Sequence, residues 1–260
     1  MKALASRRRH PAAIVILLLL GLMATGGLYS LLAPKPAQAA VAAGDDVAAG
    51  KKLFLANCAT CHGLNGEGIA PNPSLVGVGA AAVDFQVGTG RMPLAGPAIQ
   101  APRSDTVKFT DAEIASLAAY VASLGPGPSV PGDEFTKGDG DIARGNQLFK
   151  VNCAMCHNFA GAGGALTRGK YAPSLSDVSG KHIYEAMVTG PQSMPVFNDT
   201  NLFPKDKNDI ISYLHELDKN QNPGGMTLGN LGPVSEGMFV WVFGLGLMIA
   251  AAVWVGRKAA

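Results

Sequence analysis

Hydrophobic and polar positions divide this chain into two long apolar runs and, between them, a segment of shorter amphipathic patterns. Ala12–Leu32 holds 21 residues without a charge, about 31 Å as an α-helix, and Met238–Val255 holds 18 residues, about 27 Å. These lengths approach the thickness of a bilayer's hydrocarbon core. Trp241 and Trp254 lie near the two ends of the second run, where membrane proteins place interfacial aromatic residues. The pattern therefore predicts two transmembrane helices, one on each side of the amphipathic segment.

The first apolar run also fits a secretory signal peptide, because a basic segment precedes it and Ala37-Gln38-Ala39 resembles a cleavage site. The apolar core of a signal peptide usually holds about 7–15 residues, fewer than this run contains. We therefore favour a retained membrane anchor over residues 12–32 and keep the cleaved signal peptide as the alternative.

The distribution of charge predicts the orientation in the membrane. Six of the 21 basic residues lie between the runs and the two ends of the sequence, in residues 1–11 and 256–260. The segment between the runs carries the other 15 (21 − 6) and all 19 acidic residues, a formal charge of −4 (15 − 19). Positively charged flanks stay in the cytoplasm, so we expect a cell-membrane protein with both termini cytoplasmic and its middle outside. Membrane lipid is an expected partner and nucleic acid is not.

Between the apolar runs the hydrophobic spacing is helical and strand signals are scarce, so the predicted fold class is all-α. The clearest helix starts at a capping box formed by Thr110 and Glu113 and stops at Gly125-Pro126. Its apolar residues recur at helical spacing, and a similar stripe occurs about a hundred residues later. The two stripes are Ile114, Leu117, Ala118, Val121 and Leu124, and then Ile210, Ile211, Leu214 and Leu217.

The middle of the chain is a tandem repeat of two units, residues 43–125 and 141–219. Residues 126–140 form a linker, whose Gly- and Pro-rich beginning is unsuited to helix or sheet. In each unit a short helix, with Asp46 or Asp141 as its expected N-cap, leads into a Cys-x-x-Cys-His motif. A glycine-rich loop, a Pro-Ser-Leu segment, a short helix with a Met-Pro turn and the amphipathic helix follow in the same order.

The two Cys-x-x-Cys-His motifs carry the candidate chemistry, and they use all four cysteines of the sequence. This pattern is typical of covalent c-type haem attachment, in which two thiols bond to the porphyrin and the adjacent histidine ligates the iron. We therefore expect two covalently bound haem c groups. The expected attachment residues are Cys58, Cys61, Cys153 and Cys156, and the expected axial histidines are His62 and His157.

Two other interpretations of the motifs are weaker. A redox-active Cys-x-x-Cys normally follows a strand in a βαβ unit, and no strand-rich run precedes either motif. A structural zinc site needs four ligands from nearby pairs. These pairs lie 95 residues apart, and each is followed directly by a histidine.

A low-spin electron-transfer haem needs a second axial ligand, which in cytochromes c is usually a methionine. In the first unit Met92, in a Met-Pro turn, is the only methionine after the motif. In the second unit Met187 matches the 30-residue spacing from histidine to Met92, whereas Met194 matches the Thr-Gly and Met-Pro turn. We expect Met92 and Met194 to be the ligands and Met187 to pack in the interior.

Several further side chains are candidates for supporting roles. The backbone carbonyls of Pro73 and Pro173 are expected to hold the rings of the two axial histidines. The other two histidines of this segment have no counterparts in the first unit and are expected to be surface or hydrogen-bonded polar residues; they are His182 and His215. The candidates for binding haem propionates, with a solvated role as the alternative, are Arg91, Arg103 and Tyr171.

Beyond the two Cys-x-x-Cys-His motifs, five segments of the chain are distinctive: Gly50–Phe54, Asn152–Phe159, Gly169–Pro173, Thr189–Pro195 and Leu231–Trp241. With these segments the whole chain resembles the dihaem cytochrome c subunit of the actinobacterial cytochrome bcc complex, the menaquinol–cytochrome c reductase. The resemblance implies two class I cytochrome c domains, each with His/Met ligation of its haem.

The resemblance also implies partners. They are a cytochrome b subunit, a Rieske iron–sulfur subunit that donates electrons, and a haem-copper terminal oxidase that accepts them in aerobic respiration. The chain would be the electron-transfer subunit of a proton-translocating reductase, with no catalytic site of its own. The alternative is a dihaem subunit of another membrane oxidase or dehydrogenase, although an anchor after the two haem units argues against a cbb-type oxidase. A haem sensor or peroxidase would need one haem without a methionine ligand.

Overall fold

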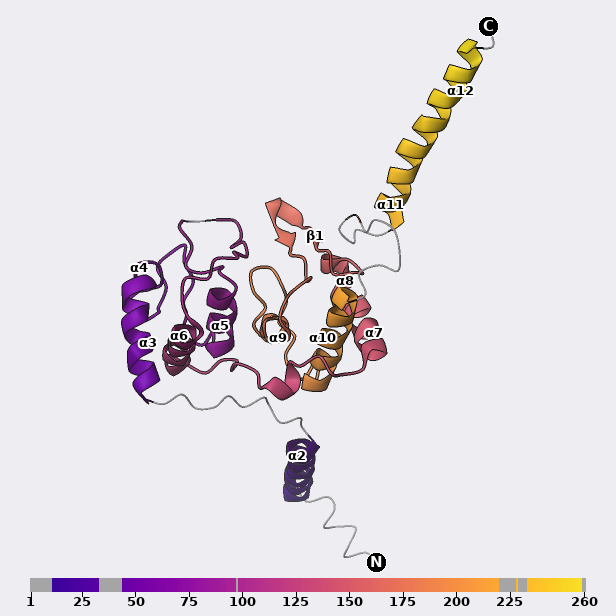
Figure 1. Cartoon of the computed structure of the whole chain (residues 1–260). Coiled ribbons are helices and arrows are strands. Elements are labelled where there is room, and N and C mark those ends of the chain that lie inside the picture. Colours follow the sequence, from indigo (N-terminus) through magenta and orange to yellow (C-terminus); the bar gives the residue numbers. More distant parts are fainter. Residues whose placement is uncertain (1–10, 33–43, 97, 220–227, 229–232, 259–260) are drawn as a thin grey trace, which may run out of the picture. The chain divides into compact units, whose positions relative to one another are not determined.

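The computed structural model describes residues 11–32, 44–96, 98–219, 228 and 233–258, and this part of the chain is predominantly helical (Figure 1). The predicted all-α class is therefore confirmed, with one small hairpin as an addition. Helix α2 (Pro11–Leu32) contains a candidate membrane span, Ala12–Leu31, with a mean hydropathy of 2.2. The basic residues 1–10 and the sequence resembling a cleavage site at 37–39 lie outside the described residues.

The second candidate span is longer than the apolar run that predicted it. Helix α11 (Pro233–Val240), a π-helical segment (Trp241–Leu245) and α12 (Gly246–Lys258) follow one another directly, and the span Val234–Lys258 has 25 residues, about 37 Å. The helix includes Lys258 because a lysine side chain can reach away from the apolar surface while its backbone stays helical. Its ammonium group lies 4.6 Å from the Trp254 ring centroid.

The first unit contains four described helices: α3 (Gly44–Asn57), α4 (Ala59–His62), α5 (Ala80–Gly88) and α6 (Asp111–Ser123). Helix α3 packs against α6, and the ring centroids of Phe54 and Tyr120 lie 5.1 Å apart in the core. The predicted capping box starts α6, because Thr110 N donates to Glu113 Oε2 at 2.8 Å and Glu113 N donates to Thr110 Oγ1 at 3.4 Å. The predicted apolar stripe of α6 faces this core.

The second unit repeats this arrangement with α7 (Ile142–Asn152), α8 (Ala154–His157), α9 (Gly180–Thr189) and α10 (Pro204–Lys219). Helix α7 packs against α10, and the ring centroids of Phe149 and Tyr213 lie 5.5 Å apart. The duplicated sequence therefore gives a duplicated helix crossing with the same aromatic pair in its core.

A glycine lies at each of these two helix crossings, eight residues before the first cysteine of its motif. A Cβ atom on Gly50 would collide with the carbonyl oxygen of Ser116 in α6, and one on Gly145 would collide with that of Asp209 in α10. Only glycine allows the helices to approach this closely. The crossing fixes the end of α3 and of α7, where the Cys-x-x-Cys-His motif begins.

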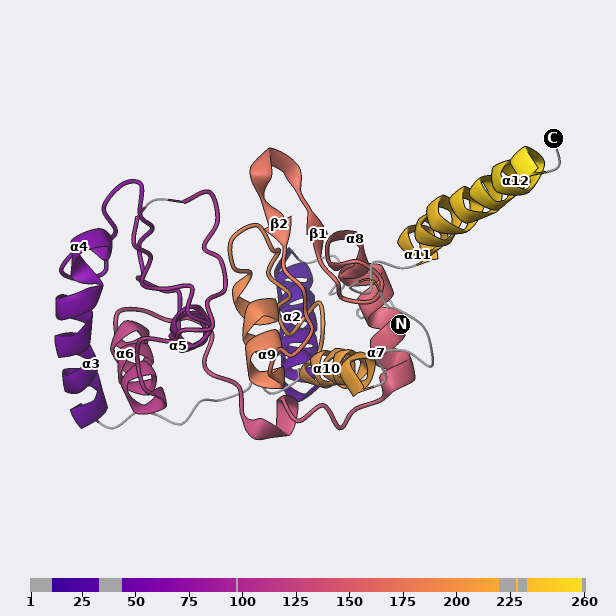
Figure 2. The ribbon, with the colours of Figure 1, turned by 45° about the horizontal axis from the view of Figure 1, so that its top comes forward.

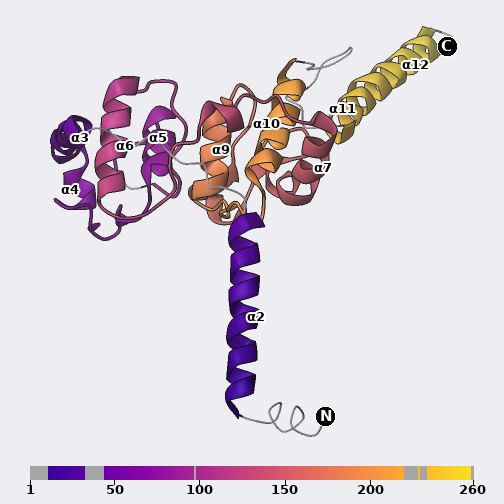
Figure 3. The ribbon, with the colours of Figure 1, turned by 90° about the horizontal axis from the view of Figure 1, so that it is seen from below.

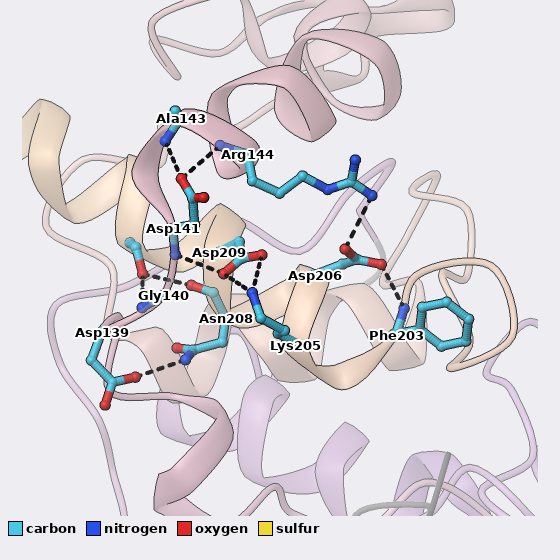
Figure 4. Close-up of polar contacts among 11 residues, drawn as sticks. Asp139, Gly140, Asp141, Ala143, Arg144, Phe203, Lys205, Asp206, Asn208 and Asp209 are labelled. Atoms are coloured by element: carbon cyan, nitrogen blue, oxygen red, sulfur yellow. Dashed lines mark hydrogen bonds and ion pairs between the residues drawn. The ribbon is translucent and has the colours of Figure 1, made fainter. Parts of the chain in front are cut away.

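Helix α7 begins at the predicted N-cap, Asp141, and is tied to α10 by polar contacts (Figure 4). The Asp141 carboxylate accepts hydrogen bonds from Ala143 N at 2.9 Å and Arg144 N at 3.0 Å. The Asp141 backbone N–H donates to Asp209 Oδ1 at 2.7 Å, and Arg144 pairs with Asp206 at 3.4 Å. These contacts hold the start of the helix that leads into the second motif.

One expectation about local structure was wrong and another was confirmed. Asp46 does not cap α3, because that helix already begins at Gly44 and Asp46 lies within its first turn. The Gly- and Pro-rich beginning of the linker holds neither helix nor sheet, as expected; a 3₁₀ turn follows it at Asp133–Phe135, and the linker packs on α5, where Ala81 N donates to Pro128 O at 3.1 Å. Prolines and glycines do not sustain repetitive hydrogen bonding, but their carbonyl oxygens still accept hydrogen bonds from neighbouring elements.

The second unit has an insertion that forms the hairpin. Twenty residues separate Cys153 from Pro173, whereas 15 separate the equivalent Cys58 from Pro73, a difference of five. Strand β1 (Gly164–Ala165) pairs antiparallel with β2 (Tyr171–Ala172) across a short 3₁₀ turn, and Figure 2 shows the hairpin beside α8 and α9.

Two hydrogen bonds join the hairpin to the first unit. The Gln100 side-chain amide donates to Tyr171 O at 2.8 Å, and its carbonyl oxygen accepts from Tyr171 N at 3.0 Å. The inserted residues therefore connect the two units as well as lengthening the second.

Candidate functional site

The two motifs share one pattern of backbone hydrogen bonds. Cys58 N donates to Phe54 O at 2.8 Å and His62 N donates to Cys58 O at 2.9 Å. In the second unit Cys153 N donates to the Phe149 carbonyl at 2.8 Å and the His157 N–H donates to Cys153 O at 2.9 Å. The one-turn helices α4 and α8 thus hold both cysteines and the histidine of each motif within one turn.

The predicted support for the two histidines is confirmed. His62 Nδ1 lies 2.8 Å from Pro73 O, and His157 Nδ1 lies 3.0 Å from Pro173 O. Because a carbonyl oxygen only accepts, each Nδ1 carries the proton and donates it. The Nε2 atom then keeps its lone pair for a metal ion, as in a histidine that ligates haem iron.

Glycines bring these carbonyl groups to the rings. Gly68 N donates to His62 O at 2.7 Å and Gly163 N donates to His157 O at 2.9 Å. Both glycines have positive φ, +86° and +80°. A Cβ atom on Gly68 would lie against the backbone of Pro73, and one on Gly163 against that of Pro173. Glycine at these two positions therefore lets the loop backbone come close enough for the histidine–proline hydrogen bond.

The environment of His157 favours the neutral imidazole. The residue is only 8% exposed, and this burial lowers its pKa, although the hydrogen bond to Pro173 O acts in the opposite direction. A neutral ring is the form that ligates a metal ion. The axial role predicted for His157 is compatible with its surroundings.

The cysteines do not have the properties of a redox-active pair. Burial, reinforced by the neighbouring Cys156, raises the pKa of Cys153 to about 12, and burial and Cys61 raise the pKa of Cys58. Redox-active Cys-x-x-Cys motifs instead depress the pKa of a thiol. Within the described residues, the group of side chains close enough to share a metal ion is Asp84, His182 and Glu185, which contains no cysteine.

A cavity of about 450 Å³ opens beside the second motif, within the size range of cofactor sites. Both cysteines and the histidine of that motif line it, together with apolar side chains of α9 and α10, so its residues fit a haem group. Part of its wall comes from the first unit. The lining includes Cys153, Cys156, His157, Met187 and Met194 from the second unit and Phe85, Arg91, Gln100 and Arg103 from the first.

The ends of α5 and α9 show how the methionines of the two units correspond. Thr89 Oγ1 donates to Phe85 O at 2.5 Å, and Thr189 Oγ1 donates to Glu185 O at 2.7 Å, so the two threonines are equivalent. Counting back two residues from each threonine makes Met187 the counterpart of Val87, a buried apolar residue that cannot ligate iron.

The methionines in the turns therefore remain the matching pair. Met187 is 2% exposed and packs in the core, as expected for an apolar filler. Met194 follows α9 in a turn in which its N–H donates to Pro191 O at 3.0 Å, and it lines the cavity. Met92 follows α5 in the same way, half-buried, with its N–H donating to Gln86 O at 2.9 Å.

The two units meet where α5 packs against α9 (Figure 3), a contact that the sequence did not reveal. Lys181 Nζ lies 2.7 Å from Asp84 Oδ1, and His182 Nε2 lies 3.7 Å from the same oxygen. The His182 ring also lies edge-on to Phe85, with centroids 6.2 Å apart. His182 is thus a polar residue of the contact between units, held by Asp84 even though it lines the cavity. His215, the other unassigned histidine, lies beside Gly138.

A buried carboxyl group accompanies this contact. Glu185 of α9 is fully buried, and its carboxyl group lies close to the side chains of Asp84 and His182. Burial, followed by the nearby charge of Asp84, raises its pKa to about 9. The residue is therefore protonated at neutral pH. No feature of the sequence pattern indicated it.

Comparisons with known proteins agree with this geometry. Residues 47–125 match the cytochrome c family, and residues 140–214 match the family of cytochrome c oxidase, cbb3-type, subunit III. The predicted architecture of two cytochrome c domains with two apolar helices is thereby confirmed. Two such domains support haem c binding and a role in electron transfer.

Three relatives illustrate the range of similarity. The cytochrome bc1 complex cytochrome c subunit of Corynebacterium efficiens is 44% identical over 269 residues, which cover 96% of this chain and 90% of the relative. The subunit of the same name from Mycobacterium tuberculosis is 45% identical over 253 residues, covering 94% and 90%. The cbb3-type cytochrome c oxidase subunit FixP of Bradyrhizobium diazoefficiens is 32% identical over 147 residues, covering 50% and 44%.

Proposed function

The chain belongs to the family of cytochrome bc1 complex cytochrome c subunits, and we propose that it relays electrons from a Rieske iron–sulfur protein to a haem-copper terminal oxidase. In this proposal it carries two covalently attached haem c groups. The observation that carries the proposal is the duplicated site, in which both histidines have Nδ1 engaged by a proline carbonyl and Nε2 free.

Each residue of the two sites has a defined part in the proposal. Bound haem would supply a one-electron redox centre at each site. The thiols of each motif would anchor the haem, and the histidine and methionine of each unit would ligate its iron, which would disfavour binding of oxygen or peroxide there. The attachment residues are Cys58, Cys61, Cys153 and Cys156, and the axial pairs are His62 with Met92 and His157 with Met194.

The membrane arrangement of the proposal follows from the two apolar helices and the charge pattern. Both candidate spans have high mean hydropathy, 2.2 and 2.3, and basic residues precede the first span and form the last turn of the second, at Arg257 and Lys258. We propose that both helices are retained in the cell membrane, that residues 43–125 and 141–219 lie on the extracytoplasmic side, and that both termini are cytoplasmic. The chain would then act as the electron-transfer subunit of a proton-translocating quinol–cytochrome c reductase.

Purification of the full chain in mild detergent tests the proposal. Haem quantitation should return two haems per chain, and cytochrome b and Rieske subunits should copurify. Replacing the cysteines of one motif with alanine, in either unit, should remove one haem and abolish quinol-driven electron delivery to the oxidase. One haem in the unsubstituted chain, or purification without cytochrome b and Rieske partners, would contradict the proposal.

One observation favours a second candidate, a dihaem electron-transfer subunit of another membrane oxidase. Residues 140–214 match the cbb3-type oxidase subunit family, and the sequence similarity to the FixP relative covers half of this chain. The bc1 complex relatives match over more than nine-tenths of the chain at higher identity, so the reductase is preferred. Copurification with an oxidase core in the absence of cytochrome b would reverse the preference.

A further inference from the structure

The cavity of the second unit contains a buried cation that comes from the first unit. Arg91 is 8% exposed, and its guanidinium carbon lies 4.7 Å from the centroid of the Phe85 ring. No carboxylate among the described residues forms an ion pair with it. A buried charge normally has a partner of opposite sign, because desolvation without pairing is costly. The position of Arg91 therefore indicates a binding site for an anionic group.

The surroundings of Arg91 strengthen this indication. Arg103 and Tyr171 line the same cavity, so two guanidinium groups lie in its wall. Two guanidinium groups that repel each other are stabilised by an anion between or beside them. Tyr171 is held in place by its two backbone hydrogen bonds to Gln100, at 2.8 and 3.0 Å.

The chemistry of the anion follows from the rest of the cavity. Its other wall carries Cys153, Cys156 and His157, the proposed attachment site of a haem. Haem c carries two propionate carboxylates, and an arginine guanidinium matches the geometry of a carboxylate with two parallel hydrogen bonds. A haem in this cavity would therefore bring the negative charge that Arg91 lacks among the described residues.

We propose that Arg91 and Arg103 of the first unit bind the propionates of the haem attached to the second unit. The inference rests on the proposed haem attachment at Cys153 and Cys156. It makes the two arginines positioning residues for a cofactor that belongs to the other unit. Arg91 directly precedes Met92, the proposed ligand of the first haem, so adjacent residues contact both haem sites. The first unit thus completes the second site and fixes the two haems relative to each other.

Redox titration of the full, haem-loaded chain in detergent tests the inference. A positive charge beside a haem favours its reduced form, so Arg91→Gln should make reduction of the second haem about tenfold less favourable, a decrease of 59 mV for one electron. Arg91→Lys keeps the charge but not the paired hydrogen bonds, and should give a smaller decrease. The matched control is Arg144→Gln, which removes the same charge from an exposed residue of the second unit outside the cavity lining.

Reference chains identify which haem responds. Met92→His and Met194→His each exchange one proposed axial ligand and should lower the potential of one haem, which assigns the two steps of the titration. If Arg91→Gln prevents haem loading, Arg103→Gln provides the same test from a more exposed position. A shift of the second potential alone, absent from the control, supports the inference. A shift of the first potential alone, or no shift with either arginine variant, overturns it.

This outcome is separable from that of the proposed function. Haem quantitation of the unsubstituted chain decides first whether two haems are attached. Two haems with unchanged potentials in both arginine variants would defeat only the assignment of the propionate site, whereas fewer than two haems would defeat the proposed function itself.

Discussion

The two haem-binding units share their backbone geometry and differ in what surrounds it. In both, the proposed axial histidine has its Nδ1 atom near a proline carbonyl, at 2.8 Å for His62 and 3.0 Å for His157. His157 is buried, whereas His62 is half-buried and the neighbouring Cys61 is exposed. The wall of the second cavity also receives side chains from the first unit.

The difference shows what duplication of a sequence preserves. The contact between the motif histidine and the proline carbonyl depends on residues within one motif and one loop, and both units contain these residues. The burial and the charged surroundings of each motif depend on features that the two units do not share. These include the five-residue insertion that forms the hairpin and the contact between α5 and α9. Since burial and nearby charge tune the potential of a haem, equivalent ligands need not give equivalent potentials.

The largest expected effect tests the proposed axial methionine of the second unit. Met194→Leu should abolish the methionine–iron absorption band of the second haem and lower its potential, because the thioether ligand is lost. Met187→Leu should leave the spectrum unchanged and cost less than about 1.5 kcal/mol of stability, as a swap of similar volume in a core. Absorption spectra and redox titration of both variants are the measurement. The reverse result would make Met187 the ligand, and Met92→Leu is the control for the first haem.

The next effect tests whether the helix crossings of the two units are equally tight. Gly145→Ala should lower the free energy of unfolding by about 1–3 kcal/mol, because the new Cβ atom would collide with the carbonyl oxygen of Asp209. Gly50→Ala should have a similar effect against Ser116. Denaturation of the haem-loaded chain measures both, with Gly96→Ala as the control, since a Cβ atom there meets no other atom. Two neutral substitutions would show that the crossings are looser than described.

A pH-dependent effect is expected from a position that differs between the units. Glu185 occupies the place of Phe85, and its pKa in the folded chain is raised to about 9, from 4.5 in the absence of the fold. The folded chain therefore keeps a proton that the unfolded chain loses, so stability is greatest below the lower pKa and falls as pH rises through the higher one. The slope from this group is at most about 1.4 kcal/mol per pH unit.

Glu185→Gln should remove this slope and stabilise the chain at pH 8 relative to the unsubstituted chain. Thermal unfolding at pH 6, 7 and 8 measures the difference. Glu134→Gln, at an exposed position in the linker, is the control and should keep the slope. An unchanged slope in the Glu185 variant would mean that this carboxyl group is ionised in the folded chain.

The smallest effect concerns the helices that lead into the two motifs. Asp141→Ala should cost about 1 kcal/mol, because the carboxylate caps α7 through two backbone N–H groups. Asp46→Ala should cost only about 0.3 kcal/mol, since an acidic residue inside the first turn of α3 interacts only with the helix dipole. Chemical denaturation of both variants compares them. Equal losses would mean that Asp46 also acts as a cap.

The features that could be predicted from the sequence are those governed by short stretches of chain. The capping box at Thr110, the cap at Asp141 and the proline carbonyls beside the two histidines were all found where the pattern placed them. Asp46 was misjudged because helix boundaries shift by a residue or two without a strong signal. The glycines of the helix crossings could have been found by aligning the repeats, since Gly50 and Gly145 stand at the same distance from their motifs.

By itself, the sequence determined the family, the two repeated units, the apolar helices and the spacing of each Cys-x-x-Cys-His motif, because these depend on residue identity and local periodicity. Only the tertiary structure decided that Arg91 and Arg103 face the cavity of the other unit, that Lys181 pairs with Asp84, and that Glu185 is buried and protonated. Such contacts join residues of different units. They depend on how the surfaces of two folded units pack together, and neither hydrophobic periodicity nor motif spacing predicts that packing.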